Sequence, residues 1–136
     1  MRIRKYLIDT HVWIWWFVFP QRLSDKTARL IEDVSQYDEI LLSAISIREL
    51  GLLIRKGRVV LKPSGPKEWV SAFLQMDKLR VIPVTAQIAY LSTTLPGSFH
   101  KDPADQILVA SAMEEDAVII TKDMHIREYR HVRSVW

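Results

Sequence analysis

Four acidic residues stand where apolar segments of this 136-residue chain begin or end. Asp9 directly follows one apolar run, and Glu49 comes a short turn after a second. Asp105 precedes a long apolar segment, and Asp123 follows the last apolar run. Carboxylates brought together repel one another, so a divalent cation is the expected reason for gathering them. Their hard oxygen atoms favour Mg²⁺ or Mn²⁺, and two such ions about 4 Å apart can promote phosphodiester cleavage.

The segments that must position these acids alternate between strands and helices. Predicted strands cover residues 5–9, 39–43, 81–84, 118–121 and, at an edge, 132–136. Predicted helices cover the aromatic segment up to residue 20, then 24–34, 46–55, 67–76, 85–93 and 103–115. A short extended piece is expected at 59–61, loops at 63–66 and 95–101, and a short turn after Asp123.

This alternation predicts one α/β domain over residues 1–136, built as a three-layer α/β/α sandwich with a mainly parallel sheet. The strand segments are continuously apolar, as expected when helices cover both faces of the sheet. The carboxyl ends of parallel strands meet at one edge, where open α/β sheets bind their ligands. The four acids are therefore expected in one crevice.

Each acid taken alone has a structural alternative. Asp9 and Asp123 can cap the helices that follow them, and Asp102 can cap the helix that opens with the next proline. Ser46 and Glu49 fit a capping box, in which the glutamate bonds back to the serine backbone. Capping does not require acids to follow strands at the start, middle and end of the chain alike. The set as a whole therefore favours a metal site.

Four short segments resemble the motifs of the PIN domain, and within it those of the VapC-like ribonuclease toxins of type II toxin–antitoxin systems. The first segment is residues 7–11, which contain the first acid, and the second is residues 42–50, which contain the second acid. The third, residues 100–106, is similar to a His-x-Asp-Pro-x-Asp-Arg motif, and the fourth, residues 120–123, is similar to a Thr-x-Asp motif. Each is weak alone, but all four stand in order and cover nearly the whole chain. Gln106 replaces an arginine of many relatives, and Arg48 replaces a frequent aromatic residue.

The resemblance implies a Mg²⁺- or Mn²⁺-dependent endoribonuclease with a PIN-like fold, an RNA substrate, a homodimeric state and a small antitoxin that blocks the active site. Asp9 and Asp105 are the expected direct metal ligands. Glu49 is expected to hold a metal-bound water or a second ion, and Asp123 to complete the pocket. Asp102 suits the role of helix cap better than that of ligand.

Six further residues are expected to support this site. The hydroxyl groups of Thr10, Ser46 and Thr121 are expected to orient the carboxylates, because hydrogen bonds to metal ligands fix the geometry of those ligands. Contacts to substrate phosphate are expected from Lys101, Lys122 and His100, although solvated surface charges are the alternative. The histidines as a group match no zinc-binding spacing.

The bulk composition is compatible with this hypothesis. The net charge of +3 permits nucleic-acid binding, and the absence of cysteine suits a cytoplasmic protein. Residues 12–19 are apolar throughout but too short to span a bilayer, so they are expected to lie in the core or in a subunit interface, with no membrane involved. Trp13, Trp15 and Trp16 cannot all point inward from one helix, so some are expected to meet a partner.

Two other enzyme classes fit the sequence less well, and one non-enzymatic function remains an alternative. A response regulator has adjacent acids after its first strand, and a haloacid-dehalogenase-like phosphatase has Asp-x-Asp there, whereas this chain has Thr10 and His11 after Asp9. The alternative is a catalytically silent PIN-like module that binds nucleic acid or protein. Such a module needs no metal ion.

Overall fold

The computed structural model describes residues 3–62, 65–77 and 79–136. Within these residues the chain builds one five-stranded sheet in the order β3-β2-β1-β4-β5, and every neighbouring pair is parallel. The strands are β1 (Lys5–Ile8), β2 (Glu39–Ser43), β3 (Leu79–Ile82), β4 (Val118–Ile120) and β5 (Ser134–Val135). The predicted parallel sheet is confirmed, including its edge strand at the C-terminus.

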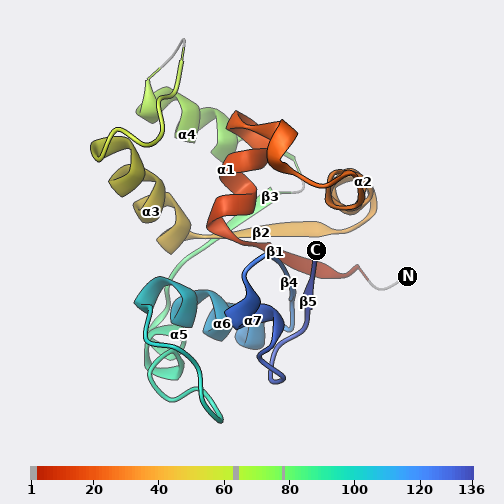
Figure 1. Cartoon of the computed structure of the whole chain (residues 1–136), viewed down its shortest axis with the longest axis vertical. Helices are drawn as coiled ribbons and strands as arrows, with labels where there is room; N and C mark the ends of the chain where they lie inside the picture. Colours follow the sequence, from red (N-terminus) through yellow and green to blue (C-terminus); the bar gives the residue numbers. More distant parts are fainter. Residues whose placement is uncertain (1–2, 63–64, 78) are drawn as a thin grey trace.

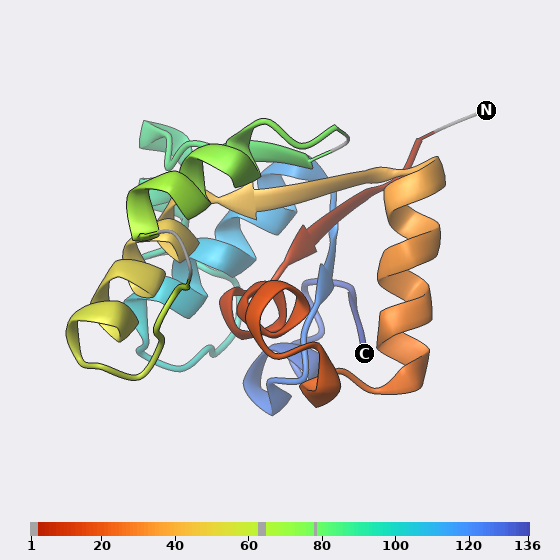
Figure 2. The same cartoon turned by 90° about the horizontal axis from the view of Figure 1, so that it is seen from above.

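Helices cover both faces of this sheet. They are α1 (Thr10–Val18), the short 3₁₀ helix η1 (Pro20–Arg22), α2 (Asp25–Tyr37), α3 (Ala44–Arg55), α4 (Pro66–Leu74), α5 (Ala86–Leu91), α6 (Pro103–Glu115) and α7 (Met124–Arg127). Helices α1 to α4 lie on one side of the sheet and α5 to α7 on the other (Figure 1). Seen from above, α2 and α3 stand at opposite ends of the first layer (Figure 2). The predicted α/β/α sandwich is confirmed.

Successive strand residues contribute to two separate cores. Ile8 and Leu42 pack into the core under α1, α2 and α4. Leu7, Leu41 and Ile119 pack into the core under α6 and α7 on the opposite face. All five side chains are fully buried, which explains why the strand segments are apolar without alternation.

Helix α6 has the predicted bounds, because two local signals define its start. Asp102 is the N-cap and accepts a 3.0 Å hydrogen bond from the backbone N–H of Asp105, while Pro103 occupies the first helical position. Helix α2 also begins as predicted, after Ser24, whose hydroxyl accepts from the N–H of Thr27, but it continues to Tyr37. The other predicted bounds lie within two residues of the observed ones, apart from the end of α2.

The capping box that was the structural alternative for Ser46 and Glu49 does not form. Helix α3 begins two residues earlier than expected, at Ala44, because the hydroxyl of Ser43 accepts a 3.2 Å hydrogen bond from the N–H of Ile45. Glu49 therefore lies inside α3, where it has no capping function.

Two predicted segments between α3 and β3 differ in their details. The extended piece at 59–61 forms no strand, although Val59 and Leu61 are buried in the core. In the predicted loop at 63–66, residues 63 and 64 lie outside the described residues. Strand β3 ends at Ile82, directly before Pro83, which has no N–H to offer a ladder.

Helix α1 is apolar on all sides, as its sequence predicts. Trp13 is fully buried and packs edge-on against Phe73 and at a tilt against Trp69, whereas Trp15 and Trp16 remain half-buried. Neither α1 nor any other helix in the described part of the chain has the length and apolarity that crossing a membrane requires.

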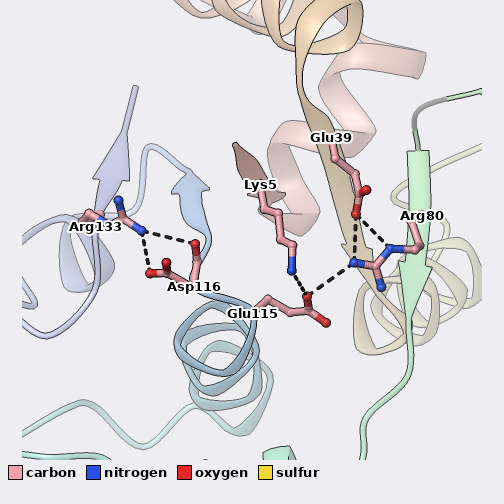
Figure 3. A network of polar contacts seen from close by, with 6 residues as sticks. All are labelled: Lys5, Glu39, Arg80, Glu115, Asp116 and Arg133. Carbon is pink, nitrogen blue, oxygen red and sulfur yellow. Dashed lines mark hydrogen bonds and ion pairs between the residues drawn. The ribbon is translucent and has the colours of Figure 1, made fainter. Parts of the chain in front are cut away.

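Oppositely charged residues join the amino ends of the strands (Figure 3). Glu115, the last residue of α6, lies 3.0 Å from the Lys5 Nζ on β1 and 3.4 Å from Arg80 on β3. Arg80 also pairs with Glu39 at the start of β2, at 2.8 Å. Burial alone would raise the pKa of Glu115, but the hydrogen bonds and charges of Lys5 and Arg80 outweigh it, so the pKa is lowered. The network therefore stabilises the fold above the pKa of an unfolded glutamate, and this contribution is lost in acid.

We expect Glu115→Gln to lower the free energy of unfolding by about 0.5–1 kcal/mol at neutral pH, because two exposed pairs are lost. The stability difference between this variant and the parent should shrink in about 1 M salt, which screens exposed charges. It should also shrink when the pH falls below the lowered pKa of Glu115. Urea denaturation at two salt concentrations measures it. Asp116→Asn is the matched control, since Asp116 pairs with Arg133 and asparagine tolerates its left-handed backbone. An equal loss in both variants would contradict a specific role for the Glu115 network.

Candidate active site

The carboxyl edge of the sheet brings the predicted acids together. Asp9 follows β1 directly, Asp123 caps α7 after β4, Asp105 lies in the first turn of α6, and Glu49 lies in α3. All four line one cavity of about 250 Å³. The remaining lining residues are Thr10, His11, Leu53, Asp102 and Ala104. The parallel strands therefore do what the sequence pattern requires, since their ends converge on one edge.

Asp9 is the most deeply placed of these acids, with a residue exposure of 6%. Its side chain forms no capping bond to α1, so the capping alternative is wrong for this residue. Instead its Oδ2 accepts a 2.6 Å hydrogen bond from the hydroxyl of Thr121. Burial raises the pKa of Asp9 and the charge of Asp123 adds to this, while the Thr121 bond, the charge of His11 and a backbone hydrogen bond from Thr10 oppose it.

Thr121 links two of the acids. It is fully buried, its hydroxyl donates to Asp9, and the same oxygen accepts a 2.9 Å hydrogen bond from the backbone N–H of Asp123. Strand pairing places Thr121 beside Asp9. Ile8 on β1 pairs with Ile120 on β4, and Asp9 and Thr121 directly follow these two residues.

Asp105 is also held where its charged form is disfavoured. Burial, followed by repulsion from the other four carboxylates of the cavity, raises its pKa to about 7. The Nε2 of His100 lies 3.0 Å from the Asp105 Oδ2, although the ring nitrogen forms no hydrogen bond of acceptable direction. The two groups therefore form a close polar contact. His100 is itself held by stacking on His125, with ring centroids 4.2 Å apart.

Two acids serve as helix caps and line the cavity at the same time. Asp102 Oδ1 accepts from the N–H of Asp105 at 3.0 Å, and Asp123 Oδ1 accepts from the N–H of His125 at 2.7 Å. Each cap uses a single carboxylate oxygen. Capping and facing the cavity are therefore compatible for both residues.

The hydroxyls of Thr10 and Ser46 bond to each other at 2.7 Å, and both residues are buried. This bond ties the start of α1 to α3, which carries Glu49. Of the three hydroxyl residues predicted to orient carboxylates, Thr121 contacts a carboxylate directly, whereas the Thr10 and Ser46 hydroxyls act on the helices that carry the acids.

The donor chemistry of the cavity fits a divalent cation. Among the described residues, no Lys or Arg forms an ion pair with Asp9, Asp105 or Asp123, so these carboxylates lack a cationic side-chain partner. Glu49 is 3.9 Å from Arg48. Within the same residues, no three acidic or histidine side chains are grouped closely enough to hold a metal ion as they stand. All the carboxylate donors are hard oxygen ligands, as Mg²⁺ and Mn²⁺ prefer.

The PIN domain family model matches residues 6–132. This chain belongs to the PIN domain family. It is 37% identical to Ribonuclease VapC22 of Mycobacterium tuberculosis over 131 residues, which are 95% of each chain.

Solved structures of other proteins share the fold. One is VapBC2 from Rickettsia felis bound to a promoter DNA fragment, with a TM-score of 0.72, 17% identity, and coverage of 96% of this chain and 97% of that chain. Another is a toxin–antitoxin complex from Klebsiella pneumoniae, with a TM-score of 0.64, 16% identity and 96% coverage of both chains. These likenesses independently support the α/β/α architecture.

This PIN domain gives its unusual Gln106 a structural contact. The side-chain Nε2 of Gln106 donates a 3.0 Å hydrogen bond to the backbone carbonyl of His100. The bond fastens the loop before α6 and thereby the position of the His100 ring beside Asp105.

The residues predicted to contact substrate differ in the cavities that they line. Lys122 lines a second cavity that adjoins the first, and His100 lines a third, whereas Lys101 is exposed and lines none of these three. Sequence reasoning missed His11 and Trp15 as cavity residues. Their spacing after Asp9 could have indicated this. His11 and Trp15 stand two and six residues after Asp9, so both fall near the mouth of a site at the start of α1.

The raised pKa of Asp105 predicts a pH-dependent stability of the metal-free PIN domain. The pKa of Asp105 in the folded state lies above that of an unfolded aspartate, so the folded state holds its proton more tightly and stability falls as pH rises from about 4 to about 7. Asp105→Asn removes this cost. We expect the variant to melt about 3 °C above the parent at pH 8, for an effect of about 1 kcal/mol after allowance for partial exposure, and to match it near pH 4.

Calorimetry in EDTA measures this difference. Asp33→Asn, on the exposed side of α2, is the control and should show no such pH trend. Equal melting differences for Asp105→Asn at pH 4 and pH 8 would rule out the electrostatic explanation.

Proposed function

We propose that this PIN domain is a divalent-metal-dependent endoribonuclease and the toxin of a type II toxin–antitoxin pair. The observation that carries the proposal is the burial of Asp9 beside Asp105, Glu49 and Asp123 in one cavity at the carboxyl edge of the sheet. Its support from comparison is the 37% identity to a protein named Ribonuclease VapC22.

Asp9 and Asp105 would hold the ion, with Glu49 and Asp123 completing the site from α3 and α7. Asp102 can add its second oxygen without giving up its cap. When bound, Mg²⁺ or Mn²⁺ supplies the charge that activates water and stabilises the leaving oxygen. The carboxylates position that charge, and Thr121 fixes the rotamer of Asp9 through the 2.6 Å bond.

The cavity accounts for a phosphodiester substrate in one further respect. An anionic backbone would be repelled by uncompensated carboxylates, so cation binding and substrate binding are coupled. His100 lies beside Asp105, and Lys122 lines a cavity together with Asp9 and Asp123, so these two residues are the proposed phosphate contacts. We expect the protein to act in the cytoplasm, where its RNA substrate is found.

An antitoxin and a second copy of the chain are the proposed protein partners. Similar folds occur in a toxin–antitoxin complex, which supports the first. The second is supported by half-buried Trp16 on α1 and by exposed Leu74 and Met76 at the end of α4, which are apolar side chains that a partner can cover.

The decisive experiment incubates the purified protein with a mixed RNA pool in Mn²⁺, Mg²⁺ or EDTA. We expect cleavage only with metal, and loss of at least about 100-fold in rate for Asp9→Asn, since even residues that merely support ligands contribute 10–100-fold. Circular dichroism should show that this variant keeps its fold.

Asp33→Asn, on the exposed side of α2, is the matched control, because it removes a carboxylate that does not line the acid cavity. We expect it to retain most of the activity. Metal binding without any RNA cleavage, or no metal binding at all, would favour the alternative of a catalytically silent binding module.

Thr121 provides a second prediction, which can be read without RNA. Thr121→Val keeps the buried shape but removes the hydrogen bonds to Asp9 and Asp123, so we expect Mn²⁺ affinity to fall about 10–100-fold in calorimetric titration. Thr121→Ser keeps the hydroxyl and should bind nearly as well as the parent. If the valine variant binds Mn²⁺ with unchanged affinity, Thr121 has no part in positioning the ligand.

A further inference from the structure

A second cavity of about 270 Å³ adjoins the acid cavity and shares Asp9, His11 and Asp123 with it. Its other lining residues are Val12 and Trp15 from α1 and Lys122 from the segment between β4 and α7. We call it the Trp15 cavity. It combines an aromatic ring, an aliphatic wall and a cation beside the proposed catalytic acids.

Trp15 is held in place but keeps its ring free of stacking. The indole of Trp136 meets it nearly edge-on, with centroids 6.1 Å apart at 69°, and the ring of His11 lies 6.2 Å away at 56°. No ring in the described part of the chain lies parallel to that of Trp15. A fixed, partly exposed indole is a suitable platform for a planar base.

Lys122 supplies the charge that such a ligand requires. Its side chain is exposed, it directly precedes Asp123, and within the described residues it forms no ion pair. A lysine in that position can meet a phosphate that lies next to the acid cavity.

The third cavity, of about 430 Å³, is a weaker candidate for the same role. Its lining includes His100, His125 and Arg130, but it shares no lining residue with the acid cavity. The Trp15 cavity, in contrast, shares Asp9 and Asp123 with the acid cavity, so a chain bound across these two acids would reach it.

We propose that the Trp15 cavity receives the base of the nucleotide next to the cleaved phosphodiester bond, with the base on the Trp15 indole and its phosphate on Lys122. This rests on the proposed ribonuclease function and adds a substrate position to it. The volume lies below the roughly 300–1,000 Å³ of pockets for drug-sized molecules, which suits one base. A base can enter only when it is unstacked, so the substrate is single-stranded or looped RNA.

The test is a scan of binding with a short labelled single-stranded RNA in which one abasic site is moved along the strand. Fluorescence anisotropy with Mg²⁺ measures affinity in an Asp105→Asn background, in which cleavage is off and the lining of the Trp15 cavity is unchanged. For the parent protein we expect one abasic position to weaken binding about 5- to 100-fold, the range of base–aromatic stacking. Trp15→Leu should weaken binding of the intact RNA similarly and remove the dependence on that position, and Trp15→Phe should restore part of it.

Trp16→Leu is the matched control, since Trp16 is a half-buried tryptophan of the same helix that lines neither cavity. It should leave the abasic profile unchanged. Lys122→Met should reduce the slope of log affinity against log salt by about 0.7, the value for one phosphate contact on a single strand.

The outcomes separate this proposal from the one on which it rests. An abasic profile that Trp15→Leu leaves intact overturns the base position, even if the protein cleaves RNA. Altered sedimentation of Trp15→Leu with an intact profile assigns Trp15 to a protein interface and likewise overturns it. A Trp15-dependent profile without metal-dependent cleavage supports the base position and refutes the nuclease. If the protein neither binds nor cleaves RNA, both the base position and the nuclease function are refuted.

Discussion

Repulsion among carboxylates is the constraint around which the carboxyl edge of this sheet is arranged. Asp9 is buried and Asp105 has a pKa raised to about 7, so both are held where their charged forms are disfavoured. Such a cluster persists only when the surrounding structure fixes it. The parallel pairing of β1 with β4 provides that support, because it sets Thr121 beside Asp9 although 112 residues separate them. A register shift of one residue would turn Thr121 to the opposite face and leave Asp9 without this donor.

The two edges of the sheet use charge in opposite ways. At the amino edge, Lys5 and Arg80 meet Glu115, and the attraction stabilises the fold (Figure 3). At the carboxyl edge, like charges are gathered and the metal-free fold is weakened. This separation has a physical logic, since an arginine or lysine paired with Asp9 would relieve the repulsion but would also occupy the oxygens that we propose for a cation. The stability lost at one edge is thus partly offset at the other.

The sequence predicts the parts of this structure that local signals determine. Continuous apolar segments indicate strands covered on both faces, and Asp102 followed by Pro103 defines the start of α6. The site residues also follow from strand ends, because in a parallel sheet these ends must converge. Ser46 shows where such reasoning stops. Its spacing to Glu49 matches a capping box, but its hydroxyl is bonded to Thr10, 36 residues away, and Ser43 caps the helix instead. No local pattern distinguishes these two serines.

A sequence pattern also does not show which oxygen of a carboxylate forms a bond. Capping and metal binding are therefore alternative interpretations of these acids in the sequence. When the sequence alone is considered, a carboxylate that is assigned to cap a helix is not counted as a metal ligand. The structure separates the two oxygens of each group: Asp102 and Asp123 each commit Oδ1 to a backbone N–H. Capping then fixes the carboxylate at the rim of the cavity rather than removing it, since a capped side chain has lost most of its rotamer freedom. Asp9 follows a different route, with a hydroxyl from the neighbouring strand in place of a helix end. Preorganisation of these acids therefore comes from helix starts and strand pairing together, which are the features that a parallel α/β sheet repeats at each strand end.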